Sequence, residues 1–353
     1  MAFTRKKVDE ALNEFSQNIK PVSLYADAWK RLRKNKMALI GICVVLFYFV
    51  ISLLAPVLPF YPYERQEMRH IHLPPSFERA GVVMMRTREA YMVRVMARDG
   101  RTEFNAAEQA ELAAMRAEIE TDPIHKRIYF LGTDVLGRDL LSRTINGGRV
   151  SLGIGVVGTI TALLIGVFYG AIAGYIGGRL DNLMMRFVDV VYGLPYMMVV
   201  IVLMSLIGSR SIYLLFLAIA LVSWLTISRV VRGQIISLKN SEFIEAARSV
   251  GASTPRIIVK HLLPNTLGII IVYSSLSFPS FILSESFLSF LGLGVSAPMS
   301  SWGSLIDEGV RGMELYPWLL IVPAAMMTIF MFSMNFVGDG LRDAFDPQGK
   351  NRT

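Results

Sequence analysis

Long apolar runs, separated by polar segments, form the dominant pattern of the chain. Six of these runs reach the roughly twenty residues that a helix needs to cross a bilayer. They cover residues 37–58, 150–173, 187–207, 212–228, 266–290 and 317–337. Because lipid offers no partner for backbone polar groups, spans of this kind form helices. The pattern predicts an all-α polytopic membrane protein with six transmembrane helices.

Basic residues lie beside particular spans and predict the orientation of the chain. A cluster of cations at residues 30–36 precedes the first span, and residues 229–261 carry six basic residues against two acids. The segment around residues 307–314 is net acidic. Positive loops stay in the cytoplasm, so we expect both termini and the 229–265 loop to be cytoplasmic. The expected units are 1–36, a first transmembrane helix 37–59, an extracytoplasmic segment 60–149, a five-helix core 150–337 and a tail 338–353.

The N-terminal segment contains one amphipathic stretch, which has two interpretations. Tyr25, Ala28, Trp29 and Leu32 share a helical face, and basic residues occupy the remainder. A tryptophan with neighbouring cations suits a helix on the inner membrane surface. A cytoplasmic helix packed on protein fits the pattern equally well.

The extracytoplasmic segment contains an insert at residues 76–129. Apolar and polar residues alternate from Tyr91 to Met96, and Asp99-Gly100 is typical of a hairpin turn. Asn105 and Glu108 have the spacing of a capping box that opens a helix. We therefore expect a small α+β insert, a hairpin followed by a helix. The three histidines of this segment lack the tight spacing of a metal site and are expected to be solvated; they are His70, His72 and His125.

Composition and motifs exclude several classes of function. Hydrophobic residues make up 53% of the chain, which indicates a membrane protein. The net charge of +8 follows from the cations beside the spans, so no nucleic-acid partner is expected. No GxxxxGK[ST] loop occurs, and the spans lack the array of acids and histidines that a proton-driven carrier needs. We expect no catalytic residue, no metal and no cofactor on this chain, so that energy comes from another protein.

The polar stretch from residue 240 to 265 lies between two spans and predicts two short helices. Ser241 can cap a helix over residues 242–250, and Gly251 suits its C-terminal stop. Pro255 suits the first turn of a second helix that leads back to the membrane. A positive φ at Gly251 would fix the angle between the two helices.

This stretch resembles the EAA signature of ABC importer permeases. The residues that carry the resemblance are Glu245, Ala246, Ala247, Gly251, Leu263 and Pro264. The resemblance implies that the first short helix docks in a groove of a partner ATPase. His261 replaces a common aliphatic residue, which narrows the match to the peptide-permease branch. A solvated loop helix is the alternative.

A second stretch, residues 131–152, resembles the GTDxxGRDxxSRxxxGxRxSL pattern of oligopeptide and dipeptide permeases. Without the resemblance, Thr133 or Asp134 would start a surface helix in which acids and arginines pair locally. Two roles are open for the candidate outer-mouth residues Asp134, Arg138 and Asp139. They either pair with one another for structural reasons or contact the substrate or its delivery protein.

Two features of the spans bear on the pathway. Small residues recur every four positions in the second span and predict close packing against another helix; they are Gly158, Ala162, Gly166, Gly170 and Gly174. Glu285 is an acid inside the fifth apolar run, so it either lines the pathway or bonds to a neighbouring helix. The surrounding SESFLSFLGLG, the Ser301-Trp302-Gly303 triplet and GDGLRDAFDP also resemble peptide permeases.

Taken together, these motifs identify the chain by resemblance as a C-type inner-membrane permease subunit of the binding-protein-dependent oligopeptide and dipeptide importers. The resemblance implies a type I (MetI-like) core in a bacterial inner membrane. It also implies a second homologous permease, two ATPases that hold ATP and Mg²⁺, and an extracytoplasmic binding protein. The solute is a peptide or a related compound such as a nickel chelate, glycoside or peptide antibiotic. A secondary transporter and a membrane scaffold are the other classes.

Overall fold

The computed structural model describes residues 24–207 and 212–345. Within these two ranges every regular element is helical, and the only β-type pairings are isolated bridges between Arg79 and Ile128 and between Thr133 and Asp139. The helical character of the spans is as predicted. The strands expected in the insert are absent from the described part of the chain.

Five of the described helical segments are long and apolar enough to cross a membrane. They are α3 (Lys36–Leu54), α6 (Leu140–Ile176), α9 (Ile212–Leu238, with its span Tyr213–Leu238), the continuous segment Thr254–Phe290, and α14 (Trp318–Phe345). The segment Thr254–Phe290 consists of α11 (Thr254–Arg256), the π-helical turn η3 (Ile257–Leu262) and α12 (Leu263–Phe290).

The span expected over residues 187–207 is sharply bent in the structure. This region belongs to two helices, α7 (Gly178–Gly193) and α8 (Tyr196–Ile207), which meet at an angle of 82° and count as a sixth span only when taken together. The break lies at Leu194 and Pro195. Leu194 is extended, with φ −80° and ψ 135°, as a residue before proline prefers to be, and proline supplies no backbone N–H to continue the helix.

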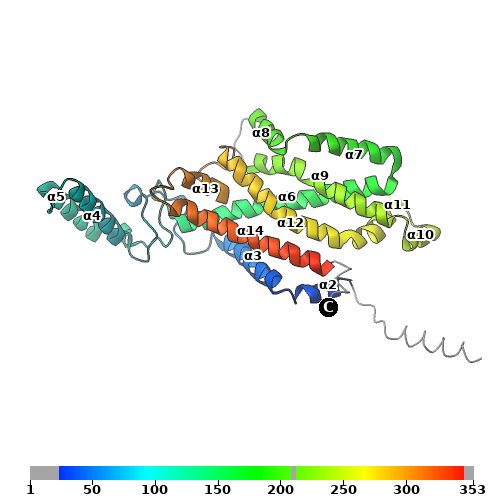
Figure 1. Ribbon diagram of the computed structural model, residues 1–353, viewed down its shortest axis with the longest axis horizontal. Helices are drawn as coiled ribbons and strands as arrows, with labels where there is room; N and C mark the ends of the chain where they lie inside the picture. The colour runs from blue at the N-terminus through cyan, green and yellow to red at the C-terminus, as the bar shows by residue number, and fades with distance from the viewer. Residues whose placement is uncertain (1–23, 208–211, 346–353) are drawn as a thin grey trace, which may run out of the picture.

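Helix α6 lies at the centre of the bundle, alongside α9 and in contact with α12, α13 (Trp302–Val310) and α3 (Figure 1). The row of small residues on α6 explains this position. A Cβ atom added to Gly166 would lie 2.7 Å from the carbonyl oxygen of Trp224, and one added to Gly174 would lie 2.8 Å from that of Arg232. Gly158 instead faces the ring of Phe281 on α12. The predicted close packing is thus confirmed, and α9 is its main partner.

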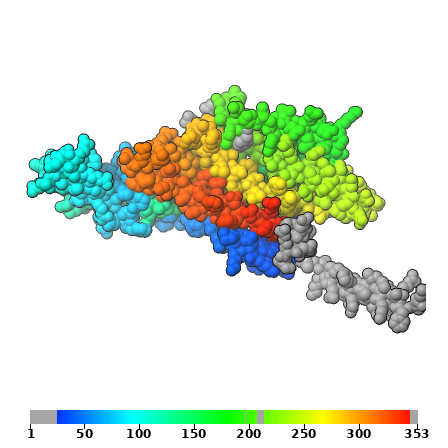
Figure 2. Space-filling view, in the orientation of Figure 1, coloured from blue at the N-terminus to red at the C-terminus, as the bar shows by residue number. Residues whose placement is uncertain are grey.

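The bundle has two distinct ends. The short helix α10 (Glu242–Ser249) lies at one end, which we call the loop-helix end, together with α2 (Leu24–Leu32). The helices α4 (Ala80–Arg98) and α5 (Ala106–Thr121) form a lobe beyond α13 at the opposite end, the hairpin end (Figures 1 and 2). On α2, Ala28 and Leu32 pack against Ala344 of α14, while Trp29 is 52% exposed. One face of α2 therefore packs on protein, and its tryptophan is exposed with the guanidinium of Arg33 over its ring.

The insert is a helical hairpin, in contrast to the predicted α+β unit. Residues 91–96 belong to α4, and Gly100, with φ +67°, turns the chain towards α5. The predicted capping box is present: Asn105 accepts a hydrogen bond from the Glu108 backbone N–H, and Glu108 accepts one from that of Asn105, both at 2.8 Å. The base of the hairpin is anchored by Ala80 and Val83, which pack with Leu73 and Tyr129.

Two of the three histidines below this hairpin, His70 and His125, are buried, so the prediction of solvated rings is wrong for them. His70, in the 3₁₀ turn η1 (Met68–His70), is fully buried, and its Nε2 lies 2.9 Å from Nδ1 of His125 in the 3₁₀ turn η2 (Pro123–Lys126). Its Nδ1 lies 3.0 Å from the hydroxyl of Tyr129. The ring of His72 stacks on Tyr316 at 3.7 Å. Among the described residues no group of three possible ligands surrounds a metal position.

Candidate functional site

Helix α10 interrupts the connection between the spans α9 and α12. Ser241 is its N-cap residue, but its hydroxyl donates to the carbonyl of Leu238 at 2.6 Å, so the predicted side-chain cap is not formed. Buried Ile244 and Ala247 hold the helix on the bundle, in one apolar cluster with residues of α9 and η3. The helix is therefore firmly docked on its own chain through one face.

The other face of α10 is exposed. Glu245 and Ala246 lie on it, whereas Ala247 packs inward and cannot reach a partner. Phe243 is 41% exposed and Val250, the C-cap, is 85% exposed. Since residues three and four apart share one side of a helix, Phe243, Ala246 and Val250 form an apolar strip beside the carboxylate of Glu245. Sequence analysis missed this strip. The signal for it was the presence of apolar Phe243 and Val250 in an otherwise polar stretch.

The turn after α10 has the conformation that its glycine allows. Gly251 has φ +82°, and its N–H donates to the carbonyl of Arg248 at 2.9 Å. The next N–H, of Ala252, bonds to the carbonyl of Ala247 at 3.0 Å. No heavy atom lies within 4 Å of a Cβ added at Gly251, so a substitution there is opposed by backbone strain alone. The left-handed turn predicted from the sequence is confirmed.

Beyond the turn, the Leu263-Pro264 pair lies where η3 passes into α12. Proline has no N–H to donate to the preceding turn, and the wider π-helical turn lies directly before it. Leu263 packs against the cluster that also holds α10, and Pro264 is exposed. The carbonyl of Pro264 accepts a hydrogen bond from the hydroxyl of Tyr25 on α2, at 3.2 Å. Leu263 thus packs with the residues that hold α10, whereas Pro264 contacts α2.

At the hairpin end, the 131–152 motif forms a buried loop followed by α6. The predicted surface helix starting at Thr133 or Asp134 is wrong, because α6 begins at Leu140 and Asp139 is its N-cap. Asp139 accepts bonds from the N–H groups of Leu141 and Ser142 at 3.3 Å each, and burial raises its pKa to about 6. It makes no pair with an arginine in the described structure.

Asp134 and Arg138 instead belong to a network that joins the loop to α13, which we call the arginine network. Asp134 accepts a bond from Arg138 Nε at 2.7 Å and one from Arg143 Nη1 at 2.6 Å. Arg143 also donates to Glu308 of α13, at 2.6 and 3.0 Å. Asp134, Arg138 and Arg143 are each at least nine-tenths buried, so these three charged side chains are largely excluded from water. Sequence analysis did not include Arg143 or Glu308 among the candidate residues of this site.

Glu285 is the centre of a second polar cluster. It is fully buried in α12 and accepts bonds from the hydroxyls of Ser289 and Ser301, both at 2.6 Å, and of Ser151 at 3.3 Å. Ser301 is the N-cap of α13 and Ser151 lies on α6. The carboxylate therefore joins three helices, and it is enclosed by protein in this conformation.

Comparison with known proteins decides the family. Residues 162–350 match the family model described as "Binding-protein-dependent transport system inner membrane component". The chain belongs to this family. Residues 23–75 further match the N-terminal transmembrane domain of oligopeptide transport permease C. The resemblance carried by the two sequence motifs is thereby confirmed.

Several characterised members of the family are similar to this chain. The dipeptide transport system permease protein DppC of Bacillus subtilis is 38% identical over 97% of this chain and 92% of its own length. The oligopeptide transport system permease protein OppC of Haemophilus influenzae is 52% identical over 65% of this chain and 73% of its own length. An inward-facing structure of the MetNI methionine ABC transporter aligns with a TM-score of 0.47, at 16% identity, over 58% of this chain and 97% of that chain.

These relatives are permease subunits of ABC transporters, so this chain is a membrane permease subunit and not itself an enzyme. The two family matches leave residues 76–161 between them. That interval contains the α4–α5 hairpin and three of the four residues of the arginine network, Asp134, Arg138 and Arg143.

Proposed function

We propose that this chain forms one half of the membrane pathway of an ATP-driven importer for di- or oligopeptides. A second homologous permease supplies the other half, and two ATPase subunits hold ATP and Mg²⁺ and power transport. A binding protein outside the membrane delivers the solute. The peptide names of the relatives support this choice of solute over nickel chelates, glycosides or peptide antibiotics.

The observation that carries the proposal is the exposed face of α10. A helix of eight residues presents an apolar strip and an acidic residue away from its own bundle, in a loop between two spans. Small and apolar side chains at the centre of a patch, with charges at its edge, suit a protein partner. In this proposal the groove of the ATPase receives Phe243, Ala246 and Val250, and Glu245 meets a basic group there.

The proposed orientation places the loop-helix end in the cytoplasm. The cations of residues 229–261 and the N-terminal cluster at residues 30–36 share this end of the bundle, and the acidic segment around α13 lies at the other end. Cytoplasmic loops carry the excess of basic residues, so both termini are cytoplasmic and the α4–α5 hairpin lies outside.

A route for coupling follows from the packing of α10. Ile244 and Ala247 share one buried cluster with Ile235 of α9 and with Ile257 and Leu262 of η3. Interiors packed in this way transmit displacement, because side chains have no free volume to absorb it. A movement of α10 imposed by the ATPases would therefore shift the ends of α9 and α12 together, and these helices open or close the pathway.

The polar clusters at the hairpin end have a bracing role in this proposal. The arginine network holds the loop at Asp134 and Arg138 against α13, and Asp139 starts α6 at the same place. Glu285 ties α12 to α6 and α13. Together they hold three helices in one arrangement at the outer mouth.

The test of the proposal uses two substitutions in the 240–265 loop. Glu245→Lys reverses the charge offered to the ATPase, and Gly251→Val places a β-branched residue at a positive φ, which strains the backbone. We expect both variants to insert normally, to lose co-purification with the ATPases and to lose uptake of a labelled peptide. Membrane abundance of the subunit is the measure of insertion.

Two matched variants serve as controls. Glu314→Lys makes the same charge reversal at an exposed position of the hairpin end and should leave docking unchanged. Gly251→Asn should retain much of the docking lost in Gly251→Val, because asparagine tolerates the left-handed region. Normal docking and uptake in both Glu245→Lys and Gly251→Val would refute the coupling role. Uptake by this chain reconstituted without ATPases would favour a secondary transporter.

A further inference from the structure

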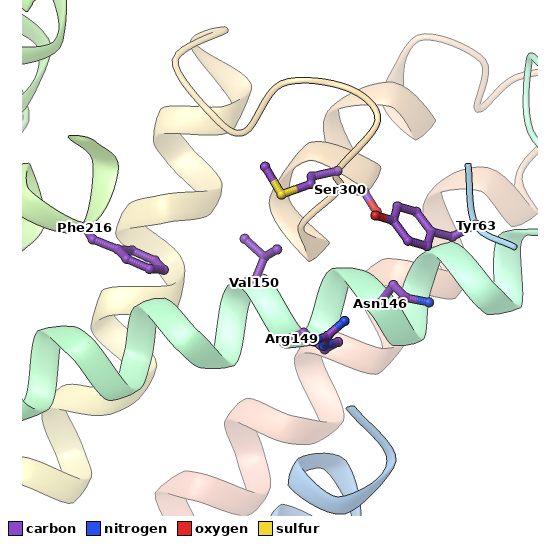
Figure 3. A pocket seen from close by; sticks show the side chains of 7 residues that line it. Tyr63, Asn146, Arg149, Val150, Phe216 and Ser300 are labelled. Atoms are coloured by element: carbon purple, nitrogen blue, oxygen red, sulfur yellow. The ribbon is translucent and has the colours of Figure 1, made fainter. Parts of the chain in front are cut away.

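A cavity of about 290 Å³ lies beside α6 near the hairpin end of the bundle (Figure 3). Asn146, Arg149 and Val150 of α6 form one wall, and Phe216 of α9 lies at one end. Tyr63, from the segment after α3, and Ser300, from the segment before α13, close the other end. Four separate segments of the chain therefore converge on this cavity.

The chemistry of the cavity is divided between its two ends. The amide of Asn146, the guanidinium of Arg149 and the hydroxyl of Tyr63 bring hydrogen-bonding groups to one part. Val150 and Phe216 bring apolar surface to the other. A ligand that combines a polar or charged terminus with an apolar side chain matches this division.

Arg149 differs from Arg143, the arginine six residues earlier on α6. Arg143 is 1% exposed and contacts two carboxylates, Asp134 and Glu308. Arg149 is exposed, and among the described residues no carboxylate oxygen lies within 4.0 Å of it. Its charge does act on the neighbouring phenol of Tyr63, where it opposes the rise in pKa that burial and Glu64 cause. Glu64 bonds to Tyr63 but forms no ion pair with Arg149, so the guanidinium has no direct carboxylate partner among the described residues.

The position of Arg149 makes this difference significant. The apolar part of α6 starts at the next residue, Val150. Charged residues in or beside transmembrane segments are costly in contact with lipid, and they commonly face a water-filled cavity and mark the path of a solute. A guanidinium also matches a carboxylate well, because its planar fork donates two parallel hydrogen bonds.

We propose that Arg149 binds the C-terminal carboxylate of the peptide as it enters the pathway. Asn146 donates a further hydrogen bond to that carboxylate or to the last peptide group, and the apolar end with Phe216 receives the last side chain. The inference rests on the proposed function and specifies the substrate feature that the permease itself recognises. A terminal carboxylate is common to peptides of any sequence, and a cavity near 300 Å³ suits the end of a ligand rather than the whole of a longer peptide.

The test uses the complete transporter, with its binding protein, in lipid vesicles. Uptake is measured for a labelled tripeptide and for its C-terminal amide, each at a concentration that saturates the binding protein. We expect Arg149→Gln to lower the maximal uptake of the free acid about tenfold and to leave that of the amide unchanged, since a lost charged hydrogen bond weakens binding by about this factor or more. Arg149→Lys should give an intermediate ratio.

Arg311→Gln is the matched control. Arg311 is also at the hairpin end, its side chain is 76% exposed, and its one ion pair among the described residues is with Asp307 of the preceding helix α13. This variant should leave the uptake of the free acid and the uptake of the amide unchanged. A tripeptide with a C-terminal photoreactive benzoylphenylalanine provides a second measurement, which does not need the amide: it should label residues 140–160 or 213–220 in the native transporter and lose this label in Arg149→Gln.

The outcomes separate the inference from the proposed function. The inference alone is overturned if the native transporter takes up peptide and the ratio of acid uptake to amide uptake is the same in Arg149→Gln. Photolabelling outside residues 140–160 and 213–220 overturns it as well. An equal loss of both uptakes, or loss of assembly, identifies a carboxylate of the second permease as the partner and also overturns it. An effect of Arg149→Gln that appears only in vesicles with anionic lipid assigns Arg149 to a headgroup and overturns it too. Failure of the native transporter to carry any peptide refutes the proposed function itself.

Discussion

Replacing Gly166 should disturb the packing of α6 on α9 more than any change to the outer surface of α6. A Cβ atom at this position would lie 2.7 Å from the carbonyl oxygen of Trp224 and 2.9 Å from the Cβ of Ile227. Neither atom is the end of a flexible side chain, so the helices themselves must separate. The row of small residues on α6 gives no alternative surface on which α9 could pack as closely.

The size of the effect follows from two opposing contributions. Forcing extra carbon into a closely packed contact costs about 1–3 kcal/mol. Exchanging glycine for alanine inside a helix returns about 1 kcal/mol. We therefore expect Gly166→Ala to destabilise by up to about 2 kcal/mol, and Gly166→Leu, which adds three further carbons at the same contact, to exceed about 3 kcal/mol.

Gly153 on the same helix provides the control. The nearest heavy atom to a Cβ added there is Phe216 Cζ at 3.8 Å, an ordinary contact, so Gly153→Ala should be neutral or stabilising by up to about 1 kcal/mol. Leu164→Ala, at a side chain that is 60% exposed, should also change little. The assay is the yield and thermal unfolding midpoint of the purified complex. Equal midpoints for the alanine variants of Gly166 and Gly153 would refute the close contact as the source of stability.

Two further predictions concern the hairpin end. Arg143→Met leaves Asp134 buried without one of its two cations and should destabilise by about 3–5 kcal/mol, whereas Arg311→Met at an exposed pair should cost under about 1 kcal/mol; comparable unfolding midpoints for the two would contradict the importance of burial. His70 has its pKa lowered to about 4, first by burial and then by the charge of His125. Because an unfolded histidine titrates near pH 6.5, stability at the hairpin base is intact above that pH and falls by roughly 3 kcal/mol as pH decreases towards 4. Protection factors for hydrogen exchange, which are corrected for the intrinsic pH dependence of exchange, should fall at residues 68–80 and 123–130 between pH 7 and pH 5 in the native protein and fall less in His70→Gln. The same fall in both proteins would assign it to another group. The carboxyl of Asp139, whose pKa is raised to about 6, acts in the opposite direction and remains in both proteins.

The sequence predicts those features that depend on neighbouring residues or on long runs. The spans follow from apolar length, and the capping box at Asn105 follows from a spacing of three residues. The turn at Gly251 follows from the conformational freedom of one residue. Each of these signals is complete within a short part of the chain, so no knowledge of the remainder is needed.

Features that depend on distant contacts could not be predicted in the same way. The alternation over residues 91–96 favours a strand, but the nineteen-residue helix α4 is fixed by packing of its first turn on Leu73 and Tyr129. His70 appears solvated in the sequence because His125 is 55 residues away. In the candidate site, the side-chain direction of Ala247 and the pairing of Arg143 with Glu308 likewise depend on tertiary contacts.

The length of α6 has a consequence for how the two ends of the molecule communicate. Its 37 residues span about 55 Å, whereas the apolar part of a bilayer is about 30 Å thick. Its first turns carry Arg143 of the arginine network, and at its other end the ring of Tyr175 lies 5.4 Å beneath the guanidinium of Arg248 on α10. One rigid rod therefore contacts both α10 and the arginine network at the hairpin end. A tilt of this rod acts as a lever, so that displacement at one end appears at the other without any relay of side-chain rearrangements across the membrane.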